Sequence, residues 1–334
     1  MKPRQSYWVI AAATGLVAAL VLLWGWPEAA KAQRWQAAWP KTDFSRHSVP
    51  LEEIISGGPG KDGIPSIDDP SFVPVSEMLA REELAPQEPV IGFVYQGDAR
   101  AYPLRILTWH EIVNDVVGGL PVTVTYCPLC NSSIVFDRRL DGQVLEFGVT
   151  GNLRNSDMVM YDRNTESWWQ QFLGEAIVGE LTGKQLRILP ARLESWQNFA
   201  ARHPDGKVLV PDGTRRPYGV NPYRRYDSAS APFLYRGDYP KNIEPMTRVV
   251  AVGTQAFALP LLRDKGRVEE GDLILTWEPG QASALDTEQI AEGRDVGNVV
   301  VQRKTGAGME DVPYDVTFAF VFHAFNPEGT WHLK

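Results

Sequence analysis

The chain has 334 residues, of which 44% are hydrophobic and 22% are charged, so it can bury a sizeable core and is not a disordered tail. Its 33 lysines and arginines stand against 41 aspartates and glutamates. The resulting formal net charge of −8 argues against nucleic acid as a partner and gives no broad basic face for anionic lipid. The 29 glycines and 25 prolines favour short strands joined by turns over long helices.

The N-terminal segment contains an uncharged, largely apolar run over residues 5–27, preceded by Lys2 and Arg4. A run of this length can span a bilayer as a helix. The basic residues before it predict a cytoplasmic N-terminus with the rest of the chain translocated. We therefore expect residues 1–32 to be a transmembrane anchor, with the membrane as a partner.

A cleavable signal peptide is the alternative interpretation of this segment, because a small-x-small cleavage site ends at Ala32. With a retained anchor, the protein is expected in the cell membrane, single-pass, with its main domain periplasmic or extracellular. With cleavage after Ala32, the protein would be secreted.

Residues 33–85 are rich in proline and glycine, which excludes long regular elements and predicts an extended lead. This lead could be a strap packed onto the main body or a loose tether. Residues 86–334 are predicted to form the main extracytoplasmic β-rich domain.

The body of the chain alternates short apolar runs with turn signals, as is typical of strands. Strands are predicted at residues 90–95, 121–126, 133–137, 143–149, 248–252, 256–261, 272–277, 299–303 and 315–322. Helices are predicted at residues 104–117 and 192–202. The expected fold is mainly β (α+β), with a barrel or sandwich-like antiparallel core and a few short helices.

Cys127 and Cys130 are the two cysteines of the chain, and they lie three residues apart directly after an apolar run. Three interpretations compete for this pair. It could be a metal knuckle that needs further ligands, a redox pair that cycles between dithiol and disulfide, or an inert structural disulfide in a turn.

A second polar group, His110, Glu111, Asn114 and Asp115, lies on the helix predicted just before the cysteines. Asn114 stands where a zinc metalloprotease helix has its second histidine, so that chemistry is not supported. His110 could complete a Cys2His metal site, with Glu111 or Asp115 as fourth ligand or proton shuttle. Alternatively, these side chains only cap neighbouring backbone groups.

Other polar and aromatic features carry weaker signals. His323 lies in an aromatic run predicted as a strand, where a hydrogen-bonded core histidine is commoner than a ligand. Loops rich in tryptophan, tyrosine, asparagine and arginine at residues 151–171 and 215–226 could line a pocket for a sugar or an aromatic ligand. Nothing indicates NAD, flavin or haem, and Asn131 replaces the histidine of a haem attachment motif.

Several motifs together resemble a family of exported bacterial and archaeal proteins of unknown function. They are WHEIVND (109–115), YCPLC (126–130), GNL (151–153), YDR (161–163), WQQ (169–171) and PYRRY (222–226). The resemblance covers residues 85–330 and implies a secreted or membrane-anchored protein. The family also includes selenoproteins with selenocysteine in the CxxC-like motif. The resemblance therefore implies that Cys127 or Cys130 is a reactive thiolate. The chain departs from the pattern at Asn131, where many relatives have glycine, and at His323.

The candidate catalytic residues are therefore Cys127, Cys130, His110 and Glu111, and the candidate metal ligands are Cys127, Cys130 and His110. Thiolate and imidazole ligands favour copper or zinc. In the redox hypothesis, Cys127 is the attacking thiolate and Cys130 is the resolving cysteine. The expected partner is then a redox or envelope protein. The competing hypothesis is a non-catalytic binding module for a carbohydrate or protein partner, with a structural CxxC turn.

Overall fold

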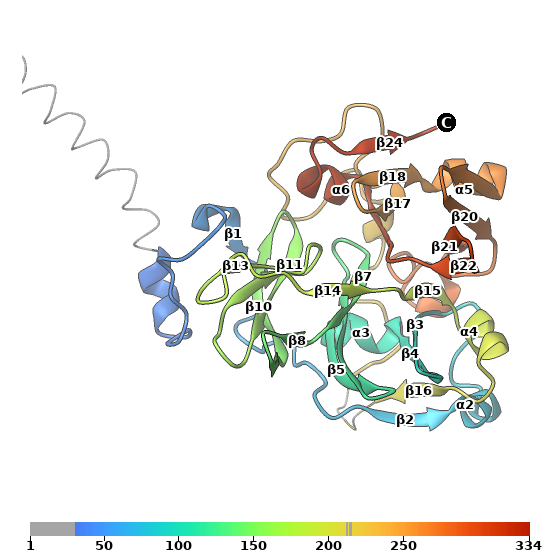
Figure 1. Cartoon of the computed structure of the whole chain (residues 1–334), viewed down its shortest axis with the longest axis horizontal. Coiled ribbons are helices and arrows are strands. Elements are labelled where there is room, and N and C mark those ends of the chain that lie inside the picture. Colours follow the sequence, from blue (N-terminus) through green and yellow to red (C-terminus); the bar gives the residue numbers. More distant parts are fainter. Residues whose placement is uncertain (1–30, 212, 214–215) are drawn as a thin grey trace, which may run out of the picture.

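The computed structural model describes residues 31–211, 213 and 216–334 (Figure 1). The apolar run at residues 5–27 lies outside the described residues, so the anchor and the signal peptide both stay predictions. Within the part of the chain that is described, no helix is long and apolar enough to cross a membrane.

The described chain is mainly β, and five sheets of four or five strands form a propeller-like arrangement (Figure 1). The mainly β prediction is confirmed, whereas the predicted barrel or sandwich-like core is not what forms. Hydrophobic alternation identifies strands but does not determine how separate sheets close around a core. The strands pair antiparallel except at two places, where residues 207–208 run parallel to residues 100–101 and residues 255–257 run parallel to residues 330–332.

The strands are grouped here by sheet, in the order in which they pair. The first sheet is β1 (Ile54–Ser56), β10 (Phe147–Arg154), β11 (Asp157–Asp162), β12 (Trp168–Gln170) and β13 (Glu175–Val178). The second is β14 (Arg187–Leu189), β7 (Ser132–Asp137), β6 (Leu120–Cys127) and β5 (Ile112–Val117). The third is β15 (Arg192–Ser195), β3 (Pro89–Tyr95), β4 (Asp98–Pro103), β16 (Lys207–Val210) and β2 (Ser71–Pro74).

The remaining sheets are formed mostly by the C-terminal part of the chain. The fourth is β23 (Asp315–Phe318), β17 (Arg248–Val252), β18 (Gln255–Ala258) and β24 (Thr330–His332). The fifth is β19 (Arg267–Glu270), β20 (Leu273–Glu278), β21 (Asn298–Thr305) and β22 (Gly308–Asp311). A short hairpin pairs β8 (Arg139–Leu140) with β9 (Gln143–Val144), around the turn that Asp141 and Gly142 predict.

Short helices connect these strands. Residues 31–36 are helical, and the α-helices between the strands are α2 (Val75–Arg81), α3 (Leu104–His110), α4 (Trp196–Arg202), α5 (Leu259–Lys265) and α6 (Ala319–Phe325). Single 3-10 turns form η1 (Leu51–Glu53), η2 (Tyr226–Ser228) and η3 (Ile290–Glu292).

The helix predicted over residues 104–117 is wrong in its second half, where the chain is strand β5. The run predicted as a strand at residues 315–322 turns into α6 halfway, so His323 lies half-buried on a helix. Similarly, residues 192–195 are a strand, and Ser195 then caps α4 by accepting a hydrogen bond from the backbone N–H of Asn198. A fully buried element is apolar on every side. Its sequence therefore lacks the periodic alternation of apolar and polar residues that distinguishes a helix from a strand.

The lead is packed onto the body. Its strand β1 pairs with β10 and its strand β2 with β16. Trp39 and Phe44 contact Trp168 edge to face, with ring centroids 5.2 and 5.3 Å away. The lead therefore contributes strands and aromatic core to the sheets that it joins.

Candidate metal centre beside a cavity

The two cysteines lie in the turn between β6 and β7. The backbone N–H of Cys130 donates to the carbonyl of Cys127 at 3.2 Å, and Asn131 adopts a left-handed backbone with φ 52°. From β23, the Oγ1 of Thr317 donates to the Cys130 carbonyl at 2.8 Å. The turn is thus fixed from both sides, and both cysteines are free and buried.

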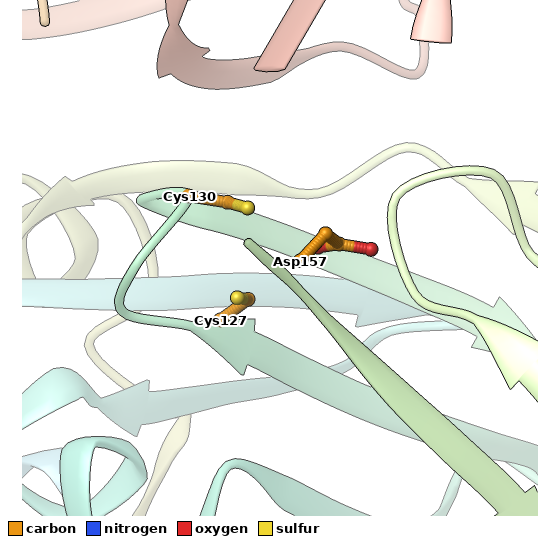
Figure 2. A group of neighbouring side chains, drawn as sticks. All are labelled: Cys127, Cys130 and Asp157. Carbon is orange, nitrogen blue, oxygen red and sulfur yellow. The ribbon is translucent and has the colours of Figure 1, made fainter. Parts of the chain in front are cut away.

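Asp157 joins the cysteines from the start of β11 (Figure 2). Its ligand oxygen and the sulfurs of Cys127 and Cys130 all lie within 4.8 Å of one another. Its Oδ2 accepts hydrogen bonds from Gln170 Nε2 at 2.6 Å and from the N–H of Phe172 at 2.9 Å. Its Oδ1 is buried and accepts no hydrogen bond from an N–H or O–H group of the described residues. The thiols of Cys127 and Cys130 hydrogen-bond with the carboxylate of Asp157, so the group offers two sulfurs and one carboxylate oxygen in mutual contact.

Burial dominates the electrostatics of this group. It raises the pKa of the Cys127 thiol and raises that of Cys130 well above its ordinary value. Burial also raises the pKa of Asp157 to about 6, although its hydrogen bonds from Phe172 and Gln170 act in the opposite direction. Without a cation, both thiols therefore stay protonated at neutral pH, whereas Asp157 is mostly ionised.

His110 is not among the side chains that meet at this group. It ends α3, is fully buried, and its Nδ1 lies 2.8 Å from the carbonyl of Pro65. Its Nε2 lies 2.7 Å from the hydroxyl of Tyr218. Both ring nitrogens are thus engaged elsewhere, and Asp157 holds the place beside the cysteines that the sequence suggested for His110.

Asn114 and Asp115 have structural partners. Asn114 accepts from the N–H of Phe147 at 3.0 Å and donates to its carbonyl at 2.8 Å, which links β5 to β10. Asp115 accepts from Arg100 and from the hydroxyl of Tyr102, each at 2.6 Å. The structure therefore does not bring Asp115 to the cysteines as a further ligand.

Glu111 does lie close to the cysteine group. It follows α3 with φ 60° and ψ −30°, and its carbonyl accepts from the N–H of Tyr126, the residue before Cys127, at 2.8 Å. Its side chain faces a cavity, although the residue is only 7% exposed. Burial, with a contribution from the charge of Asp157, raises its pKa to about 8. Such a carboxyl can both donate and accept a proton near neutral pH.

The cavity has a volume of about 460 Å³ and adjoins the cysteine group through Glu111, Leu129 and Met158. Segments of the lead (residues 57–64), of β10 and of the loop at residues 222–233 form its other walls. A cavity of this size accommodates a small organic molecule.

Left-handed backbone at residues other than glycine recurs around this site. Besides Asn131, it occurs at Glu111 (φ 60°), Ser156 (φ 65°) and Arg225 (φ 64°). Ser156 precedes Asp157, and Glu111 and Arg225 line the cavity. Such conformations cost about 1–3 kcal/mol each and gather where function requires them.

Asp157 is the residue that sequence reasoning missed. It belongs to a polar block that suggested only a pocket wall, and no spacing relates it to the cysteines. Asn155 and Ser156 both have positive φ, at 53° and 65°, and form the turn of the β10–β11 hairpin. A polar pair between two apolar runs is a hairpin signal, which could have placed Asp157 at the start of a strand.

Comparison with known proteins gives one match. The model of a family described as "Protein of unknown function (DUF3179)" matches residues 61–329. The chain belongs to this family. The matched region contains the cysteine turn, Asp157, Glu111 and most of the cavity wall. None of the curated proteins and none of the solved structures compared with the chain matches it.

Proposed function

We propose that Cys127, Cys130 and Asp157 bind a zinc ion, and that this ion and Glu111 act together on a molecule held in the cavity. The observation that carries the proposal is the grouping of three ligand atoms within 4.8 Å of one another, two of them sulfurs. The hydrogen bonds of both thiols with the carboxylate of Asp157 support it further, because a cation that replaces the thiol protons would meet all three ligands.

The donor set favours zinc over copper, the other metal that the sequence suggests. Zinc accepts thiolate and carboxylate ligands together, whereas copper(I) favours soft sulfur ligands alone. In a tetrahedral zinc site the ligand atoms lie about 3.3–3.8 Å from one another, because each is about 2.0–2.3 Å from the ion. Side-chain adjustments of about 1 Å would bring the group to that geometry.

Three protein ligands leave a fourth position open, as in catalytic rather than structural zinc sites. A zinc ion in such a site supplies a Lewis acid. Glu111 lies beside the group at the cavity wall, and its role in this proposal is to hold or release a proton at its carboxyl. The cavity walls would orient the bound molecule and exclude water.

Thiol redox chemistry is the second candidate, and one observation favours it. Both cysteines are free, and their sulfurs are close enough for a modest movement to join them. Formation of a disulfide would release two protons and pass two electrons to an envelope redox partner. The raised pKa of both thiols disfavours this step, because the thiolate is the reactive form. A metal ion also needs the thiolates, but it lowers the pKa of the thiols that coordinate it.

We also propose that the site faces the outside of the cytoplasmic membrane. This rests on the sequence of residues 1–32 alone, as an anchor or as a signal peptide cleaved after Ala32. Protease accessibility in spheroplasts and sequencing of the mature N-terminus test it, and a domain protected from external protease would contradict it.

The metal test is elemental analysis of the anaerobically purified full chain, with thiols titrated on the same samples. The wild type is expected to hold about one zinc per chain, and Cys127→Ser and Asp157→Asn to lose it. Asp141→Asn, an exposed aspartate in a hairpin turn, is the matched control that keeps the metal. Absence of metal together with a reversible disulfide would favour the redox hypothesis. A chain with neither a metal nor a reversible disulfide would favour a binding module with a structural turn.

A further inference from the structure

The cavity wall includes an exposed arginine, Arg225, that has no charged partner among the described residues. Besides Glu111, the charged side chains on the cavity wall are those of Arg224 and Arg225. Arg224 pairs with Glu288 at 3.0 Å. The guanidinium of Arg225 has neither a hydrogen bond nor an ion pair within the described parts of the chain. Its positive charge is therefore available to a molecule entering the cavity.

The backbone presents Arg225 in an unusual way. Its φ of 64° and ψ of 13° lie in the left-handed region, and its N–H donates to the carbonyl of Asp286 at 2.6 Å. Glycine adopts this conformation without steric penalty, whereas an arginine carries a conformational cost there. A binding role for the side chain would account for that cost.

The loop that carries Arg225 is held by a buried ionic network. Two residues on, the Oδ2 of Asp227 lies 3.2 Å from Arg248, 3.1 Å from Arg294 and 2.5 Å from the hydroxyl of Ser283. Arg248 and Asp227 are both buried. This network fixes the backbone at the base of the loop that carries Arg225.

The rest of the wall suits an apolar body. Met158, Leu129, Tyr226 and Phe233 line the cavity, and Phe233 is 57% exposed. Tyr226 also fixes Phe233, because its hydroxyl accepts the N–H of Phe233 at 3.3 Å. A cavity lined by both an exposed phenylalanine and an unpaired guanidinium suits a ligand that is apolar at one end and anionic at the other.

We infer that the cavity binds a small organic anion, with its carboxylate or phosphate on Arg225 and its apolar body against Tyr226 and Phe233. The inference rests on the proposed function, since it names the substrate class of the same site. A guanidinium binds planar carboxylates and phosphates through paired hydrogen bonds, so both anions are compatible with it.

Calorimetric titration of the full chain tests the inference with three probes that share a phenyl group: 3-phenylpropionate, phenyl phosphate and the neutral 3-phenylpropionamide. At least one anion is expected to bind about tenfold or more tightly than the amide, since a hydrogen bond to a charged group contributes more than a neutral one. The stronger of the two anions identifies the head group.

Arg225→Ala should abolish this preference, and Arg225→Lys should retain part of it. Arg263→Ala, at an exposed arginine on α5 beside Asp264, is the matched control and should bind as the wild type does. Equal binding of anions and amide, or a preference that survives in Arg225→Ala, would overturn the inference.

Zinc content measured on the same samples separates this inference from the proposed function. Arg225→Ala should keep the metal while losing the anion preference. An anion preference without any metal would refute the zinc proposal alone, and metal without an anion preference would refute the inference alone.

Discussion

Replacement of Glu111 by glutamine should change how the stability of the metal-free protein depends on pH. In the folded chain, burial and the charge of Asp157 raise the pKa of Glu111 from 4.5 to about 8. Between these values the folded state keeps a proton that the unfolded state has already released. The free energy of unfolding contributed by Glu111 therefore falls as pH rises from about 4.5 to about 8.

The size of this effect follows from the difference between the two values. Each pH unit corresponds to about 1.4 kcal/mol, so the interval from 4.5 to about 8 amounts to about 5 kcal/mol. Glutamine does not titrate and nearly preserves the side-chain volume. Relative to the wild type, Glu111→Gln should therefore gain up to about 5 kcal/mol of stability as pH rises through this interval. Asp157 contributes a similar slope up to about pH 6 in both proteins.

Denaturant titration in the presence of a chelator, at several values between about pH 5 and about pH 9, measures this difference. Glu328→Gln, at an exposed glutamate, is the matched control and should follow the wild-type curve. If the stabilities of Glu111→Gln and wild type run parallel across this range, the assigned protonation of Glu111 is refuted.

Three further substitutions test the site and its support. Asp157→Asn should abolish zinc binding while leaving two titratable thiols; zinc retention measured by elemental analysis would remove Asp157 from the ligand set. Gly151→Ala should displace the lead, because Gly151 has φ 75° and an added Cβ would lie 2.0 Å from the carbonyl oxygen of Pro59. A loss of about 2 kcal/mol or more in denaturant titration is expected, and wild-type stability would contradict the packing of the lead. Trp168→Ala should cost about 3–5 kcal/mol and expose the segment before β1 to limited proteolysis; an unchanged digestion pattern would show that this tryptophan does not hold the segment.

The sequence best predicted the strands and turns that depend on adjacent residues. Short apolar runs correctly marked β3, β6, β7 and β17, and the Asp141–Gly142 pair marked a hairpin, because these signals depend on adjacent residues. The three-residue spacing of the cysteines likewise identified a turn. Glu111 was selected for its chemistry, but on a continuous helix, because nothing in the apolar pattern revealed the break at its positive φ.

The third member of the site could not be read from spacing. Asp157 reaches the cysteines only because two hairpins of different sheets lie side by side, and that contact is long-range in the chain. His110 was a reasonable choice by proximity in sequence, yet the end of α3 directs it to Pro65 and Tyr218. Predicting ligands from sequence distance favours residues that are close in the sequence. Packing of two sheets instead brings together residues that are far apart in the sequence.

Several unfavourable features meet at one place in this fold, and they have a common explanation. Two thiols, Asp157 and Glu111 are buried together, and the burial raises the pKa of each of them. Glu111 and Ser156 add strained backbone at the same location. Selection for stability alone would replace these groups with apolar ones, since buried charge and strain both destabilise a fold. In the proposed function, a divalent cation would offset the clustered acidity by replacing thiol protons, and the cavity beside it would hold the molecule on which that cation acts.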